Sequence, residues 1–160
     1  MSSINSLYFN DIEVEEDFRS ILSALFSTKE IYSLFGREIN FIPIDYVVGK
    51  DVDLPAVDFQ IIESTTINTD DEQNHRYSEF SVNINVYTSG KNKVLKNRKL
   101  CNEIIKTLQS NGAMEHYYCR GLVLESNNDF NGIVDDCYRR TIIMSGLCDN
   151  ENKLIKGERK

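Results

Sequence analysis

The chain has 160 residues, of which 41% are hydrophobic and 27% are charged, and its formal net charge is −7. This length and composition indicate one soluble domain with a sizeable core, and the acidic balance argues against a general nucleic-acid-binding protein, which usually has a basic face. No apolar run reaches the roughly 18 residues that a membrane helix needs, and the N-terminus has no secretory pattern. We therefore expect no membrane partner, and we expect free thiols at the widely spaced Cys101, Cys119, Cys137 and Cys148.

Two helices are predicted first. The segment "DIEVEEDFRSILSALF", which Asn10 can cap, has apolar residues at helical spacing: Val14, Phe18, Ile21, Leu22 and Leu25. The shorter "STKEIYSLFG" has Ser27 and Glu30 in a capping-box pattern, and Gly36 stands where a helix ends. We expect one long helix followed by a short one.

Two strands and a third helix follow. "PAVDFQIIES" and "SEFSVNINVYTSG" alternate apolar and polar residues, which predicts half-buried strands with these inward positions: Val57, Phe59, Ile61, Phe80, Val82, Ile84 and Val86. In "KNKVLKNRKLCNEIIKTLQSNG", helical spacing predicts one apolar stripe made of Val94, Cys101, Ile104, Ile105 and Leu108. Asn111 and Gly112 mark the end of this helix.

Two further strands, "HYYCRGLVLES" and "CYRRTIIMSGL", are expected to form a hairpin. The predicted class is therefore α+β, with an antiparallel or mixed sheet of about four main strands and helices packed on one face. We expect a single domain over residues 1–148 and a charged C-terminal tail over residues 149–160.

The stretch "NNDFNGIVDD" between these strands has the oxygen-bearing residues and the glycine of a calcium loop: Asn127, Asp129, Asn131, Gly132 and Asp135. The motif's twelfth position, however, is Tyr138 rather than Glu, and the flanks alternate like strands. Asn131 and Gly132 form a tight-turn pair. We therefore expect a solvated hairpin tip.

A turn near Asn131 also fixes a cross-strand register. That register places Arg139 diagonally next to Glu125, which predicts an ion pair between them. It places Cys119 opposite Ile143, so that no disulfide crosses the hairpin.

Other candidate sites lack essential residues. "YTSGKNK" resembles a phosphate loop, but Asn85 and Asn92 occupy positions that require Gly and Ser or Thr. His75 lies in a polar connection, and the spacing of His116 and Cys119 sends them to opposite faces of a strand. We therefore predict no catalytic residue, no cofactor, no metal and no enzymatic activity.

The cluster "NKVLKNRK" concentrates basic residues on the third helix. They are most simply a solvated face. The functional alternative is a docking surface for an acidic partner, which can be a neighbouring copy of the same chain.

Three phrases, "FSVNINVYTSG", "LCNEIIKTLQS" and "CYRRTIIMSG", occur in the order in which comparable phrases occur in a known family. With the helical start and the proline-bearing strand start, they resemble the tail terminator (neck) proteins of tailed bacteriophages over roughly residues 11–147. The acidic insertion around residues 70–75 and the charged C-terminal extension depart from the pattern of that family.

The resemblance implies a structural virion protein at the top of the tail, assembled in the host cytoplasm as a homohexameric ring. Such a ring binds the tail tube protein and the head-side connector or stopper, with sheath protein as a further partner, while DNA passes without specific binding. The predicted ring contacts join basic and acidic residues of neighbouring copies: Lys93, Lys96, Arg98 and Lys99 with Asp70, Asp71 and Glu72. Open alternatives are another tail-completion protein, a contractile-particle component and a small phage anti-defence protein.

Overall fold

The computed structural model describes residues 9–42, 53–67, 77–110, 119–130 and 137–150. Within these residues the chain forms three helices and five strands. In order, they are α1 (Asp11–Phe26), α2 (Lys29–Phe35), β1 (Asn40–Phe41), β2 (Ala56–Ile67), β3 (Tyr77–Thr88), α3 (Lys93–Gln109), β4 (Cys119–Phe130) and β5 (Tyr138–Asp149).

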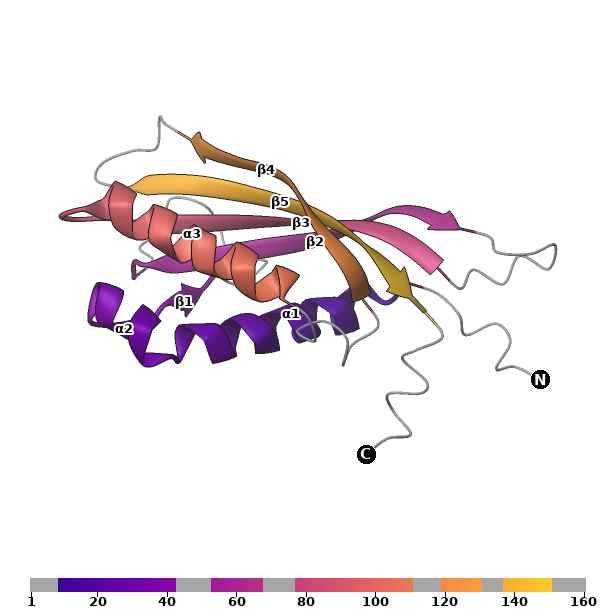
Figure 1. Cartoon of the computed structure of the whole chain (residues 1–160), viewed down its shortest axis with the longest axis horizontal. Helices are drawn as coiled ribbons and strands as arrows, with labels where there is room; N and C mark the ends of the chain where they lie inside the picture. The colour runs from indigo at the N-terminus through magenta and orange to yellow at the C-terminus, as the bar shows by residue number, and fades with distance from the viewer. Residues whose placement is uncertain (1–8, 43–52, 68–76, 111–118, 131–136, 151–160) are drawn as a thin grey trace.

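The strands form one mixed sheet in the order β1-β2-β3-β5-β4 (Figure 1). All neighbours are antiparallel except β1, which runs parallel to the start of β2. The predicted α+β class is confirmed. Strand β1 was not predicted, because a strand of two residues is too short to show an alternating pattern.

The helices lie on one face of the sheet, where α1 and α3 contact each other and the strands (Figure 1). The alternating positions of β3 are fully buried there, as the sequence predicted. Residues from both layers make up one core: Val14, Phe18, Leu22, Phe59, Phe80, Val82, Ile84, Leu100, Ile104, Leu108, Ile142 and Met144. Burial of this apolar surface joins helices to sheet and fixes which sheet face remains open.

The first two helices begin and end with recognisable caps. Asn10 caps α1, because its Oδ1 accepts a hydrogen bond from the Glu13 amide at 3.2 Å. The capping box predicted at Ser27 is wrong: Thr28 is the N-cap of α2, and its Oγ1 accepts from the Ile31 amide at 3.4 Å. Gly36 ends α2 as predicted, with a left-handed φ of 68°.

The predicted apolar stripe of α3 is wrong at its first member. Val94 is 37% exposed, and the buried residues of the helix begin instead at Asn97. Val94 lies in the first turn of α3, at the end of the packed interface, whereas Cys101 and Leu108 lie further along the helix and are buried.

Strand β5 also runs further than expected. It continues to Asp149, and Asn150 is buried and donates through Nδ2 to Ser78 Oγ at 3.1 Å. The folded domain therefore includes two residues that the sequence assigned to the charged tail. The rest of that predicted tail, residues 151–160, lies outside the described residues.

Candidate functional site

The basic start of α3 was singled out by the sequence, and we use the name basic face for Lys93, Lys96, Arg98 and Lys99, of which Lys96 and Arg98 project from different sides of the helix. Arg98 and Lys99 are exposed, while Lys93 and Lys96 are half-buried. Two apolar side chains interrupt the cations: Val94 and Leu95, the latter 53% exposed. Charge and apolar surface are thus combined on the first two turns of one helix, as in many protein-docking surfaces.

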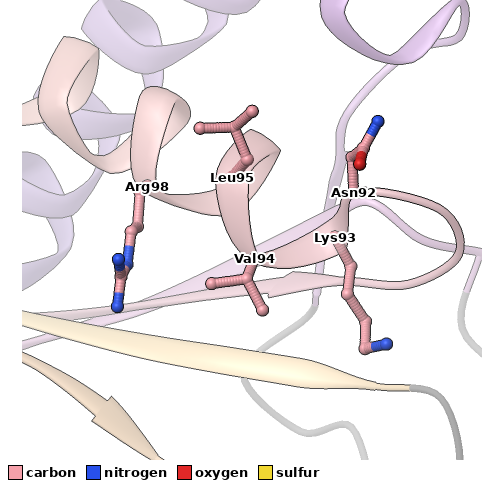
Figure 2. A pocket seen from close by; sticks show the side chains of 5 residues that line it. All are labelled: Asn92, Lys93, Val94, Leu95 and Arg98. Atoms are coloured by element: carbon pink, nitrogen blue, oxygen red, sulfur yellow. The ribbon is translucent and has the colours of Figure 1, made fainter.

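Figure 2 shows the side chains at this helix start. Lys93, Val94 and Arg98 project to one side of α3, whereas Leu95 and Asn92 project to the other. Together these residues line a shallow, open depression. A depression this open lacks the enclosure of a small-molecule site, so the surface suits a chain segment better than a ligand.

The tight turn before α3 fixes where this helix begins. Gly90 and Asn92 both have left-handed backbone angles, with φ of 83° and 61°. Thr88 Oγ1 then donates to the Lys93 carbonyl oxygen at 2.8 Å, which ties the end of β3 to the first turn of the helix. This turn is the segment that resembled a phosphate loop.

The electrostatics of this helix start are unusual. Asn92 makes no side-chain capping hydrogen bond, and the first turn of α3 contains no acidic residue. The amide end of a helix carries a partial positive charge, so cations placed there are unfavourable by a few tenths of a kcal/mol each. The basic face therefore lowers the stability of the start of α3. This cost favours a role in binding an anionic partner over a purely structural role.

The acidic half of the predicted contact, Asp70, Asp71 and Glu72, lies outside the described residues. The residues that flank it are described: Ile67 at the end of β2 pairs with Tyr77 at the start of β3. These two flanking residues lie at one end of β3, and α3 follows the other end (Figure 1).

The sheet face away from the helices carries a row of polar side chains across three strands. Asp58 in β2 accepts from Asn85 Nδ2 at 2.7 Å and from the Tyr87 hydroxyl at 2.9 Å. Asn85 Oδ1 in turn accepts from Thr141 Oγ1 at 2.6 Å. These bonds run perpendicular to the strands and hold β2, β3 and β5 in register on a face that remains accessible to water or to a partner.

Tyr87 is the group in this row whose pKa is shifted from its usual value. Burial, followed by the adjacent Asp58 carboxylate and its hydrogen bond, raises the pKa of Tyr87 to about 12, against an opposing effect of Arg139. The phenol therefore stays protonated at neutral pH and acts as a hydrogen-bond donor.

The β4–β5 hairpin is confirmed, but its predicted register is wrong. Pairing ends at Phe130 opposite Arg139, so the connection is longer than a tight turn at Asn131 and Gly132 allows. Glu125 does not pair with Arg139; its Oε1 accepts from Ser145 Oγ at 2.7 Å. Two register shifts in β4, between Arg120 and Val123 and between Leu124 and Ser126, add to the displacement.

The true register also changes the neighbours of the cysteines. Cys119 pairs with Cys148 rather than with Ile143. The structure places Cys101, Cys137 and Cys148 in no disulfide; Cys101 and Cys148 are buried, and Cys137 is half-buried. The argument against a disulfide across the hairpin placed Cys119 opposite Ile143, and that placement is wrong.

The described residues of the calcium-like pattern lie in a strand. Asn127 and Asp129 lie in β4, and Asn127 Oδ1 accepts a hydrogen bond from Arg140 Nε on β5. Asn131, Gly132 and Asp135 lie outside the described residues. A loop that begins with two strand residues cannot wrap around an ion as a calcium motif does.

Other candidate chemistry is sparse in the described part of the chain. His75 and His116 lie outside it. Among the described residues, no group of three or more histidine, cysteine or acidic side chains is arranged to hold a metal ion. No helix in those residues is long and apolar enough to cross a membrane.

The sequence analysis did not predict two features of the structure. The first is Asn97, a buried amide that joins α3 to β3 and β5; its place on the apolar face was a usable sign. The second is the outer edge of β4, where Val123 is 54% exposed and Leu124 is also exposed. The alternation in "HYYCRGLVLES" predicted a strand, but strand order within the sheet is not encoded in such a pattern.

Comparisons with known proteins do not assign this chain to a family. No protein-family model matches the chain, and no curated protein sequence matches it significantly. The functional argument therefore rests on the geometry above and on the resemblance carried by the sequence.

Proposed function

We propose that this chain is a structural subunit of a bacteriophage neck: a tail terminator whose copies form a ring. That ring caps the tail tube, stops its growth and offers a new surface to the head-side connector. The protein performs no chemical reaction in this proposal, and DNA passes through the ring without specific recognition. The resemblance of the three sequence phrases motivates the choice of family.

The observation that supports assembly with other copies is the open edge of β4. This strand has 12 residues and pairs with β5 on one side, and no other described strand lies along its outer side. Long exposed edges are templates for pairing with another chain, and proteins that stay monomeric usually block them. Val123 and Leu124 expose apolar surface on this strand, although the two register shifts that flank them interrupt its regular pairing.

Two further properties support a structural role. The helices cover one face of the sheet, so the opposite face, with its row of bonded polar groups, is available as a second contact surface. The depression at α3 is open to solvent and is lined by residues of a single helix start. Such a molecule is built to make contacts on several sides.

The test is the particle formed by the purified chain, alone and with tail tube protein as a template. We expect rings in end-on electron micrographs and a hexamer mass by native mass spectrometry. Val123→Lys should reduce ring formation, because a lysine on the edge discourages strand pairing. Ile12→Lys is the matched control, since Ile12 is also exposed but lies on α1, away from the edge.

The outcomes separate the alternatives. Rings that form equally well with Val123→Lys would remove β4 from the interface while leaving the terminator proposal standing. A chain that stays monomeric with and without the tube protein would contradict the proposal. A monomer that acts on a host component would favour the anti-defence alternative.

A further inference from the structure

The sheet face opposite the helices carries a group of exposed apolar side chains. Ile62 in β2 pairs with Ser81 in β3, and Ser81 pairs with Ser145 in β5. Ser145 pairs in turn with Val123 in β4, and Leu147 lies two residues further along β5 on the same face. Ile62, Val123 and Leu147 are 47%, 54% and 36% exposed. We call these three side chains the apolar group; two small serines lie between them.

The apolar group departs from the pattern of a solvated sheet face. Such a face usually carries polar side chains, as Gln60 and Asn83 do in a neighbouring cross-strand pair. In β2, however, Ile61 is buried in the core and Ile62 is exposed on the other face. The helices lie on the core side of the sheet (Figure 1), so the described residues leave the apolar group uncovered. Exposed apolar side chains that gather in this way mark a contact with another molecule.

The face that surrounds the apolar group is large enough for a stable interface. Strands β2, β3, β4 and β5 have 12 residues each and lie side by side. With about 4.8 Å between strands and about 3.3 Å per residue, four such strands cover roughly 19 Å by 40 Å, or about 760 Å². A standard stable interface buries about 800 Å² on each partner. One flat partner of the same size would therefore cover this face.

A second sheet covers the apolar group better than a single helix does. Ile62 and Val123 lie three strand spacings apart, which is about 14 Å. A helix packed along the strands is about 10 Å wide and would leave one of the two side chains exposed. Two sheets pack face to face at a separation of about 10 Å, with their strands within about 30° of each other, and this packing brings all four strands into contact.

We propose that the chain forms a twofold dimer in which the open sheet faces of two copies pack against each other. The twofold axis runs parallel to the strands, midway between β3 and β5. This rotation places β2 over β4 of the second copy and β3 over β5, and it keeps each cross-strand row at its own level. Ile62 of one copy then contacts Val123 of the other, on both sides of the axis. The contact goes beyond the proposed function, because it uses the sheet face and not the edge of β4.

The two faces are complementary in this arrangement. Each side chain of β3 faces the side chain of β5 with which it pairs inside one copy. The phenol of Tyr87 therefore faces the guanidinium of Arg139. The carboxylates of this face belong to different strands and different levels of the sheet, so none of them meets another carboxylate: Asp58, Glu79 and Glu125. The contact thus buries apolar surface and avoids repulsion between like charges.

An exchange of charges tests the arrangement. Ile62→Lys and Val123→Glu each place a charge against an apolar side chain in two equivalent contacts, so each variant alone should dimerise about tenfold or more weakly than the native chain. In an equal mixture, the introduced lysine faces the introduced glutamate in one contact, and Ile62 faces Val123 in the other. The mixture should recover dimerisation to within about threefold of the native chain. Sedimentation velocity without tube protein measures each equilibrium, and native mass spectrometry identifies the heterodimer.

Leu147→Lys separates the sheet face from the sheet edges. Strand β5 lies between β3 and β4, so Leu147 lies on no edge of the sheet. This variant should also weaken the dimer about tenfold or more. Tyr32→Lys is the matched control, because it adds the same charge and Tyr32 is 48% exposed on α2, on the other side of the sheet. The control should dimerise like the native chain. Far-ultraviolet circular dichroism establishes that each variant is folded.

Each result decides the proposal. A native chain that is monomeric at micromolar concentrations would overturn it, as would a Leu147→Lys variant that dimerises as well as the native chain. Single variants that weaken the dimer, with no recovery in their mixture, would show that Ile62 and Val123 do not face each other and would overturn the twofold arrangement. A Tyr32→Lys dimer as weak as the Leu147→Lys dimer would do the same, because added charge alone would then explain the loss. The terminator proposal is decided separately, by ring formation with the tube protein.

Discussion

Asn97 in α3 donates a hydrogen bond from Nδ2 to the carbonyl oxygen of Val86 in β3 at 2.9 Å, and the Asn97 side chain is fully buried. The same nitrogen lies 3.2 Å from Thr88 Oγ1 and 3.4 Å from the Tyr138 carbonyl oxygen. Cys101 Sγ donates to Asn97 Oδ1 at 3.2 Å. One amide therefore joins the helix that carries the basic face to the ends of two strands.

Replacing this amide should be costly. We expect Asn97→Ala to lower the free energy of unfolding by about 2–4 kcal/mol, because strand carbonyl groups lose their partner in a site without water access and a cavity remains. Urea denaturation followed by circular dichroism measures the change. Asn102→Ala, at an exposed position of the same helix, should change stability by less than about 0.5 kcal/mol. Equal effects of the two would show that Asn97 contributes little.

The pKa of Tyr87 predicts a loss of stability in alkali. The pKa is raised from 10.0 to about 12 in the folded protein, so between these pH values the folded state binds more protons than the unfolded state. Stability from this group is therefore fully present below pH 10 and falls as the pH rises toward 12. The full shift corresponds to about 2.7 kcal/mol, and solvent screening at a partly accessible site reduces it to about 1–2 kcal/mol.

The comparison is with Tyr87→Phe, which lacks the titrating hydroxyl. Urea unfolding at stepped pH should show a steeper alkaline decline for the native chain than for the variant. Spectrophotometric titration should show that the tyrosine lost in the variant is among the last to ionise. Parallel pH curves for the two proteins would contradict the role of Asp58 and burial.

The N-cap of α2 can be located by mutation. Thr28→Ala should cost about 1 kcal/mol, because the Ile31 amide loses its acceptor. Ser27→Ala should cost less, since Ser27 Oγ only donates to the Ser23 carbonyl oxygen at an exposed position. Thermal unfolding of both variants measures the difference. A larger effect at Ser27 would restore the capping box that the sequence predicted.

Calcium should leave the protein unchanged. Asn127 Oδ1 accepts from Arg140, and the backbone at Asp129 is paired in β4, so this part of the motif is a strand and not the loop that calcium binding requires. We expect neither a change in melting temperature nor a saturable change in tyrosine fluorescence when calcium is added. Magnesium at the same ionic strength is the control. A micromolar, calcium-specific response would contradict the strand assignment.

The sequence by itself determined the elements and their buried faces. Alternation in β3 placed Phe80, Val82, Ile84 and Val86 inward, and helical spacing placed Val14, Phe18 and Leu22 on one side of α1; all of these are fully buried. Such patterns are local, because a strand or helix exposes one face to the core at a fixed period. The basic cluster on α3 could also be identified from the sequence, because its residues lie close together along the chain.

Only the tertiary structure decided how these elements meet. The length of the β4–β5 connection and two bulges set the register, so that Cys119 pairs with Cys148 and Val123 with Ser145. Strand order placed β4 at the edge of the sheet, with β5 as its one described neighbour. These relations depend on contacts between residues distant in sequence, which no local period encodes.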